Sequence, residues 1–179
     1  MMTTRILIAV MLVLTIIPTS KTFAQDASAS QLVKVHLEPI IEIAALESPN
    51  VNLGFNSISD YIGGIRSSAQ TFSVHSNKDF VVSVRTNSSS FSYSGNAYPA
   101  PQMPVSNVLF LEVAENQTGG TIANSFNAYR SLSNTPRDLL LDCKNGGNQT
   151  FAVNYKATPG TDFPAGDYTV DVIYTATQP

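Results

Sequence analysis

Short runs in which apolar and polar residues alternate recur along most of the chain. Successive side chains of a β-strand point to opposite faces, so such runs are typical of strands with one buried face. Strong helix formers never recur at helical spacing over a long window. The pattern therefore predicts an all-β chain, with strands within residues 32–44, 51–55, 72–75, 80–85, 91–93, 108–113, 139–143, 151–156 and 168–176.

The first run places Val33, Val35 and Leu37 on one face of the predicted strand. Pro39 interrupts this run, and proline has no N–H to donate to a ladder. We therefore expect either an edge strand or a strand that changes partner at this point.

Two later segments carry further local signals. The runs at 72–75 and 80–85 flank the turn residues 76–79, which predicts a β-hairpin. Residues 121–138 have no clean period, and a short helical turn is possible there.

About seven to nine strands at these spacings, with no helices to cover a sheet, predict an immunoglobulin-like, two-sheet antiparallel β-sandwich. A closed barrel is the alternative. No internal repeat or linker divides the chain, so residues 25–179 are predicted to form a single domain.

The first 24 residues have the layout of a cleavable secretory signal peptide. Arg5 precedes the apolar stretch Ile6–Ile17, and small residues at Thr22 and Ala24 favour cleavage after Ala24. The apolar stretch is shorter than the roughly 20 residues that span a bilayer, although a retained signal anchor is the alternative. We expect export to the periplasm, the cell surface or the medium, with no membrane span in the mature chain.

Charge excludes some classes of partner. The whole chain has a net charge of −3, and loss of Arg5 and Lys21 leaves 8 basic and 13 acidic residues, a net charge of −5. A mildly acidic chain lacks the basic surface that nucleic acid or anionic lipid requires, so neither is an expected partner.

The residues offer no recognisable catalytic or metal centre, so we expect a non-enzymatic protein with no cofactor. The two histidines, His36 and His75, fall on polar strand faces, and no Gly-x-Ser-x-Gly elbow occurs. The turn acids at Asp162, Asp167 and Asp171 match no known calcium loop. A hydrolase with an unrecognised site remains an alternative.

Cys143 is the only cysteine, so no internal disulfide can form. Its two interpretations are a small buried apolar residue or a thiol that bridges chains or reacts. Asn-x-Ser/Thr sequons at Asn87, Asn116 and Asn148 matter only in a host that glycosylates them.

Phe91, Tyr93 and Tyr98 lie in a long loop rich in small and polar residues. Their rings could form a small platform for a sugar or another ligand, and packing within the loop is the alternative interpretation.

Residues 163–177 (FPAGDYTVDVIYTAT) resemble the closing strand of bacterial exported β-sandwich families. These families include spore-coat-U-like and pilin-like fimbrial subunits and WxL cell-surface domains. Residues 37–43 followed by 52–55 look like their first strand and the step after it. The chain has no tryptophan and a single cysteine, so neither the WxL signature nor a pilin disulfide is present. The resemblance implies the architecture and transfers no functional residue.

The leading hypothesis is a secreted surface or fimbria-like structural or adhesive subunit that acts through its strand edges. An open sandwich leaves unpaired edges to which another chain can add a strand. Residues 32–44 and 168–176 are the predicted terminal strands, and protein partners or self-assembly are expected. The alternative is a monomeric carbohydrate- or ligand-binding module that uses the loop Phe91–Met103.

Overall fold

The computed structural model describes residues 25–179, so the predicted signal peptide lies outside the described residues. The chain divides into two compact units, Met1–His36 and Leu37–Pro179. In the first unit, residues 25–36 form neither helix nor strand. All of the described helix and strand structure belongs to the second unit.

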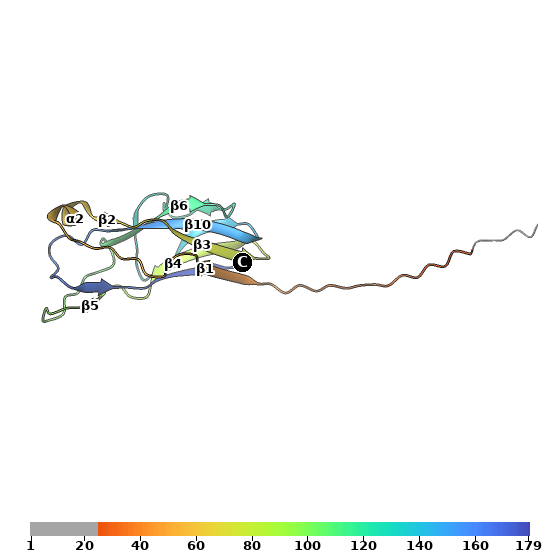
Figure 1. Cartoon of the computed structure of the whole chain (residues 1–179), viewed down its shortest axis with the longest axis horizontal. Coiled ribbons are helices and arrows are strands. Elements are labelled where there is room, and N and C mark those ends of the chain that lie inside the picture. Colours follow the sequence, from red (N-terminus) through yellow and green to blue (C-terminus); the bar gives the residue numbers. More distant parts are fainter. Residues whose placement is uncertain (1–24) are drawn as a thin grey trace, which may run out of the picture. The chain divides into compact units, whose positions relative to one another are not determined.

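The second unit is built from two antiparallel sheets arranged as a sandwich, which confirms the predicted all-β fold (Figure 1). The first sheet contains, in order, β1 (Ile41–Ala45), β3 (Gln70–Ser76), β10 (Gly146–Ala157), β6 (Leu109–Asn116) and β8 (Arg130–Ser131), with β2 (Ile65–Arg66) also paired to β10. The second contains β12 (Val172–Thr177), β4 (Phe80–Thr86), β9 (Arg137–Cys143) and β7 (Thr121–Ile122).

A separate two-stranded sheet pairs β11 (Asp167–Thr169) with β5 (Ser92–Ser94). The described chain therefore has 12 strands, more than the sequence predicts. The additional strands β2, β7 and β8 have two residues each, too few to show an alternating pattern.

The core lies between the two sheets and is formed by the inward residues of the alternating runs. Each large apolar side chain moved from water into such a core stabilises the fold by about 1.5–3 kcal/mol. The largest fully buried apolar side chains are Phe80, Phe126, Phe151, Leu111, Leu139, Leu140, Val74, Val82, Val84, Val105 and Val153.

The predicted hairpin is wrong, because β3 and β4 belong to opposite sheets. The turn between them carries the chain from one sheet to the other. Ser76 Oγ donates to the carbonyl of Lys78 within the turn at 2.6 Å, and Asn77 N donates to the carbonyl of Ile40, just before β1, at 3.3 Å. The alternating pattern of two consecutive strands, each with one buried face, is compatible both with a hairpin and with a crossing between the two sheets.

The predicted first strand is also wrong over residues 32–40, because β1 begins only at Ile41. Asn77 holds the chain just before β1: its Nδ2 donates to the carbonyl of Glu38 at 2.7 Å, and its Oδ1 accepts from Ile40 N at 2.9 Å. Pro39 lies between these two contacts and has no N–H for a ladder. The side chains of Val33, Val35 and Leu37, expected to be buried, are 76%, 75% and 78% exposed.

The predicted closing strand is divided into β11 and β12, which lie in different sheets. Asn87 binds the chain at the break: its backbone N donates to the carbonyl of Asp171 at 3.0 Å, and its Nδ2 donates to Asp171 Oδ2 at 2.8 Å. These bonds bend the chain at a point where the alternating pattern of side chains continues without interruption.

The single described helix, α2 (Ile58–Gly63), is absent from the sequence prediction. A capping box at Ser57 and Asp60 fixes its first turn. The helical turn suggested for residues 121–138 is wrong, since that stretch contains no helix and consists of turns, irregular segments, the short strands β7 and β8 and the start of β9.

Candidate functional site

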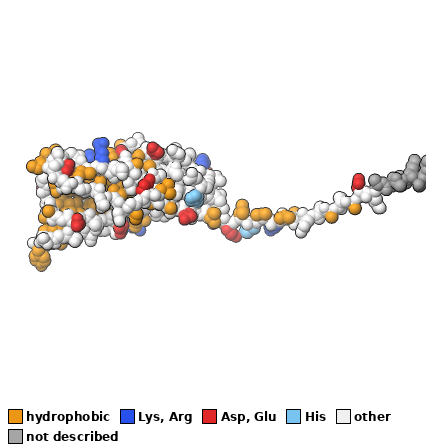
Figure 2. Space-filling view, viewed as in Figure 1, with side chains coloured by type: hydrophobic (Ala, Val, Ile, Leu, Met, Phe, Trp, Pro, Cys, Tyr) orange, Lys and Arg blue, Asp and Glu red, His pale blue; other side chains and the backbone are white. Residues whose placement is uncertain are grey.

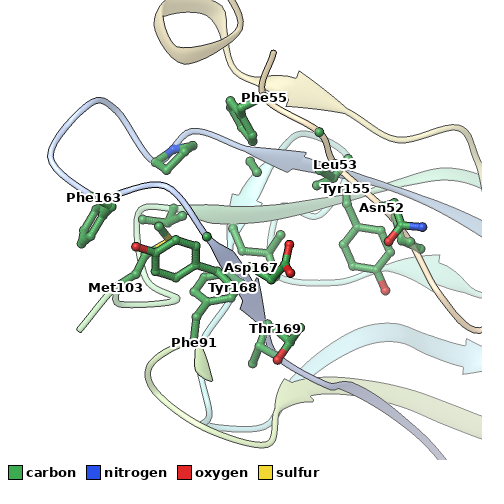
Figure 3. Close-up of a pocket in the computed structure, with 18 of the residues that line it drawn as sticks. Asn52, Leu53, Phe55, Phe91, Met103, Tyr155, Phe163, Asp167, Tyr168 and Thr169 are labelled. Carbon is green, nitrogen blue, oxygen red and sulfur yellow. The ribbon is translucent and has the colours of Figure 1, made fainter. Parts of the chain in front are cut away.

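A cavity of about 990 Å³ opens beside α2 and β11 (Figure 3). Figure 1 shows α2 and β5 at the same end of the second unit. A smaller cavity of about 180 Å³ shares Pro49, Val51, Tyr155 and Val172 with it. The two cavities form one elongated slot, which is hereafter called the slot. In the space-filling view, hydrophobic side chains line a hollow at this end (Figure 2).

One wall of the slot is the extended segment 51–55, which follows β1 in the chain. Val51, Leu53 and Phe55 occupy every second position and all line the slot. Tyr61 of α2 packs on Phe55 with ring centroids 5.2 Å apart. The backbone of residues 51–55 forms no hydrogen bond with any other described residue. The prediction of a strand over residues 51–55 is therefore wrong, because this segment pairs with no described strand.

The opposite wall is β11, which pairs with β5 along one edge. Its other edge has no strand partner within residues 25–179. Tyr168 lies on this wall beside Phe91 and faces the cavity (Figure 3). Both walls thus present backbone without a strand partner, and residues 51–55 also carry a row of apolar side chains.

The floor of the slot is part of the hydrophobic core. Leu109, Tyr155 and Ala157 line the slot although their exposed fractions are only 6%, 7% and 8%. A molecule bound in the slot would therefore contact the same side chains that hold the two sheets together.

A hydrogen-bonded tyrosine pair lies at the deep end of the slot. The hydroxyls of Tyr155 and Tyr174 are 2.7 Å apart. Burial raises the pKa of Tyr155 to about 12, and burial also raises the pKa of Tyr174 well above its usual value. Both hydroxyls are therefore neutral over the physiological pH range. They are polar groups within the otherwise apolar floor of the slot.

The charge at the slot is acidic. The charged residues among the described residues that line it are Glu47, Asp167 and Asp171, and all three are acidic. Asp167 is exposed on β11, whereas the carboxylate of Asp171 accepts from Asn87. Asp167 is consequently the carboxylate that is available to a basic group on an incoming molecule.

The structure does not bring the three predicted platform residues together. Phe91 lines the slot, but Tyr93 packs behind it against Tyr168, with ring centroids 5.0 Å apart. The Tyr93 hydroxyl donates to the carbonyl of Ala165 at 3.0 Å and accepts from Ala97 N at 3.1 Å. Tyr98 is 98% exposed and does not line the slot.

Most of the residues that form the slot were not predictable as site residues from the sequence. Leu53 and Phe55 read as an ordinary short strand, and nothing in their alternation shows that the strand lacks neighbours. Tyr168 reads as an inward residue of the closing strand. The one available signal was the resemblance, which covers both residues 52–55 and residues 163–177.

The remaining candidate chemistry does not assemble into a site. Within residues 25–179 no group of three or more His, Cys, Asp or Glu side chains is placed to hold a metal ion. Cys143 is buried, its Sγ accepts from Thr118 Oγ1 at 3.2 Å, and burial raises its pKa. Its interpretation as a small buried residue is confirmed.

The three sequons differ in how far their amide groups are engaged. Asn87 Nδ2 binds Asp171, and Asn116 Nδ2 donates to the carbonyl of Gly120 at 2.9 Å. Asn148 is exposed on β10, beside an irregularity in the register.

Two further findings bear on function. No helix within residues 25–179 is long and apolar enough to cross a membrane. No model of a known protein family matches the chain, and no curated protein matches it. Its likeness to exported β-sandwich families therefore stays a prediction from the sequence.

Proposed function

We propose that the chain is a non-enzymatic, exported surface subunit of fimbria-like type that assembles with other protein chains by strand addition. The supporting observation is the tail segment, defined as residues 32–37. Leu32, Val33, Val35 and Leu37 in this segment are 94%, 76%, 75% and 78% exposed.

The tail segment has the composition of a strand but lies in no sheet of the described structure. Large exposed apolar side chains in a row mark an interaction site, because a protein leaves few such patches uncovered. Alternating apolar side chains on an extended backbone suit the addition of a strand to another sheet, in which main-chain bonds supply affinity and alternate pockets supply specificity.

The test compares the chain that starts at Gln25 with a version that starts at Glu38, by sedimentation velocity over a range of concentrations. We expect concentration-dependent oligomers for the first and monomers for the second. The deletion stops before the Asn77 contacts and leaves β1 in place. A deletion that reaches Ala44 would remove most of β1 and confuse unfolding with loss of assembly.

A matched pair of variants distinguishes strand addition from nonspecific aggregation. Val33→Ser with Val35→Ser removes the apolar face and should abolish the oligomers. Ser30→Ala with Gln31→Ser changes polar positions that precede the tail segment and should leave the oligomers unchanged. A chain from Gln25 that is monomeric at every concentration would overturn the proposal.

Export is part of the same proposal, since residues 1–24 have the layout of a signal peptide. Expression of the full sequence in a bacterial host should yield a product outside the cytoplasm whose mass corresponds to a start at Gln25. An exported product that retains residues 1–24 would contradict cleavage.

A second candidate function is a ligand-binding module, and the slot favours it. Its size lies at the upper end of the usual range for small-molecule sites, and aromatic rings stand beside the carboxylate of Asp167 (Figure 3). Binding on a glycan array that is lost in Phe91→Ala and Tyr168→Ala, but kept in Tyr98→Ala, would support it. Absence of such binding together with tail-dependent oligomers favours the assembly subunit.

A further inference from the structure

The interior of the slot suits a hydrocarbon chain. Its floor is formed by Leu109, Tyr155 and Ala157, which are almost fully buried, and residues 51–55 add a row of apolar side chains along one wall. Each methylene that such a surface removes from water strengthens binding by up to about fourfold. A sugar placed on the same floor would leave most of its hydroxyl groups without hydrogen-bond partners.

The charge in the slot selects the sign of a ligand. Glu47 accepts from the backbone N of Thr71, and Asp171 accepts from Asn87 Nδ2. Asp167 is exposed and has no hydrogen bond or ion pair with another residue in the range 25–179. No Lys, Arg or His of that range lines the slot. A cationic group is therefore attracted to Asp167, whereas an anionic group would meet only carboxylates.

Aromatic rings line the part of the slot that contains Asp167. Phe91, Phe163 and Tyr168 all contribute to this lining (Figure 3). The ring centroids of Phe163 and Tyr168 are 6.4 Å apart, and the Tyr168 hydroxyl donates to the carbonyl of Pro164 at 2.8 Å. Ring faces attract ammonium groups, and alkylated ammonium is the typical ligand of aromatic cages. The rings and the carboxylate thus favour the same chemical group.

The tyrosine pair at the deep end can donate one further hydrogen bond. Tyr155 and Tyr174 have two hydroxyl hydrogens between them, and the bond that joins their oxygens uses one. Neither hydroxyl bonds any other residue that the structure describes. The second hydrogen can therefore be donated to an oxygen acceptor on a bound molecule.

We infer that the slot binds a long-chain amine, with its ammonium group beside Asp167 and its alkyl chain along the floor toward Tyr155. This inference rests on the second candidate function, the ligand-binding module, and names its class of ligand. The order of groups along the slot is a carboxylate among rings, an apolar floor and a hydroxyl pair. An alkylamine with an oxygen at the far end of its chain has the complementary order.

Three probes of equal chain length test the preference for a cation. Decylamine, decanol and decanoate are titrated into the chain that starts at Gln25 by calorimetry, at concentrations below those at which the probes aggregate. We expect decylamine to bind about tenfold more tightly than decanol, because its ammonium group binds a carboxylate. Decanoate should bind most weakly, since it is an anion at neutral pH. Equal affinity for all three probes would mean nonspecific adsorption and would overturn the inference.

A matched pair of variants assigns the preference to one carboxylate. Asp167→Asn removes the charge and keeps the shape of the side chain. It should abolish the advantage of decylamine over decanol and leave the affinity for decanol unchanged. Asp162→Asn is the control, because Asp162 is exposed and does not line the slot. A preference that survives Asp167→Asn, or that Asp162→Asn also abolishes, overturns Asp167 as the partner of the ammonium group.

The position of the alkyl chain is tested in two ways. Along the series hexylamine, octylamine and decylamine, affinity should rise by up to about fourfold for each added methylene. In NMR spectra with decyltrimethylammonium, the N-methyl groups should give NOEs to Tyr168 and the terminal methyl group to Tyr155. NOEs from the terminal methyl group to the exposed Ile58 and Ile62 of α2 would place the ligand outside the slot and overturn the inference.

A hydroxyl group at the far end of decylamine tests the tyrosine pair. It should change the affinity for the native chain little, because the free hydroxyl hydrogen of the pair can bond to it. In Tyr155→Phe with Tyr174→Phe, the same hydroxyl group should weaken binding about tenfold. Plain decylamine should bind both proteins equally, which controls for the folding of the variant. An equal loss in both proteins would overturn the placement of the chain end at Tyr155.

The outcomes separate this inference from the functions proposed above. Glycan binding through Phe91 and Tyr168 without binding of any amine overturns the inference and leaves the ligand-binding module standing. Absence of both glycan and amine binding overturns both. Binding of decylamine that depends on Asp167 supports both, whatever the result of the glycan array. Tail-dependent oligomers test the assembly subunit alone.

Discussion

At the scale of single residues, the few polar groups buried in the apolar core each have a specific hydrogen-bond partner. The hydroxyls of Tyr155 and Tyr174 share one hydrogen bond, and Phe72 packs on Tyr174 with ring centroids 4.4 Å apart. Cys143 is enclosed and bonded to Thr118. Each of these groups depends on one partner, so each can be tested by removing that partner or changing its protonation state.

The tyrosine pair predicts a loss of stability at alkaline pH. Its hydroxyls titrate at pH 10 when unfolded, but the folded pKa of Tyr155 is about 12 and that of Tyr174 is raised well above 10. The stabilisation is complete below about pH 10 and is lost as pH rises toward the folded values, because only the unfolded chain ionises readily. Urea unfolding at a series of pH values measures this loss.

Variants assign that loss to the pair. Tyr155→Phe leaves the Tyr174 hydroxyl without its partner and should cost about 1–3 kcal/mol at neutral pH. Tyr155→Phe with Tyr174→Phe should be milder and should flatten the alkaline slope. Tyr98→Phe removes an exposed hydroxyl and serves as the control. An unchanged slope in the double variant would contradict the assignment.

Cys143 is predicted to be inert in the folded protein. The thiolate is the reactive form, and both burial and the raised pKa of Cys143 reduce its presence. A thiol reagent should label the native chain slowly and the urea-unfolded chain at once, whereas an added Tyr98→Cys should be labelled in both. Rapid native labelling of Cys143 would mean that the β9 region opens readily.

At the scale of elements, the chain uses short connections to change sheets. β3 passes to β4 across the sandwich, and β11 passes to β12 through a bend held by Asn87. Alternation shows that a strand has a buried face, but it is equally compatible with either sheet. For this reason the strands at 80–85 and 139–143 were predictable from the sequence and their partners were not.

Gly120 marks a place where two elements approach too closely for a side chain. A Cβ there would lie 2.3 Å from the carbonyl oxygen of Leu141 and 2.8 Å from Cys143 N. Gly120→Ala should therefore force β7 away from β9 and destabilise the fold by about 1–3 kcal/mol. Urea unfolding measures the effect.

Gly147 is the matched control, because a Cβ at that position meets nothing within 4 Å. Gly147→Ala should change the free energy of unfolding little. Equal stability of the two variants would show that the contact between β7 and β9 yields without cost.

At the scale of the whole molecule, the sandwich is closed at one end and open at the other. Gln178 closes the first end through the carbonyl of Ile40 and through Ser76 Oγ at 2.8 Å. The slot opens the second. The sequence predicted the layers, since period-2 runs without helices leave few other folds. It could not predict the slot, because residues 51–55 alternate in the same way whether or not a neighbour pairs with them.

The closed end predicts an effect of shortening the chain. Removal of Gln178 and Pro179 takes away the hydrogen bonds from Gln178 Nε2 to Ile40, Ser76 and Asn77, and should cost about 0.5–1.5 kcal/mol for each bond lost. Removal of Pro179 alone keeps these bonds and should change little. Thermal unfolding compares the two, and identical Tm values would mean that β1 and β12 hold together without Gln178.

The hydrogen bonds from the Asn77 side chain to Glu38 and Ile40 determine which part of the fold would bear a force that pulls on the N-terminal segment. Tension on residues 32–37 reaches β1 through Glu38 and Ile40, and β1 pairs with β3 in antiparallel register from Ile41 with Ser76 to Ala45 with Phe72. A pull directed along β1 loads that whole ladder in shear, so its bonds must fail together rather than one after another. A chain of such units would resist stretching far better than the modest length of β1 suggests.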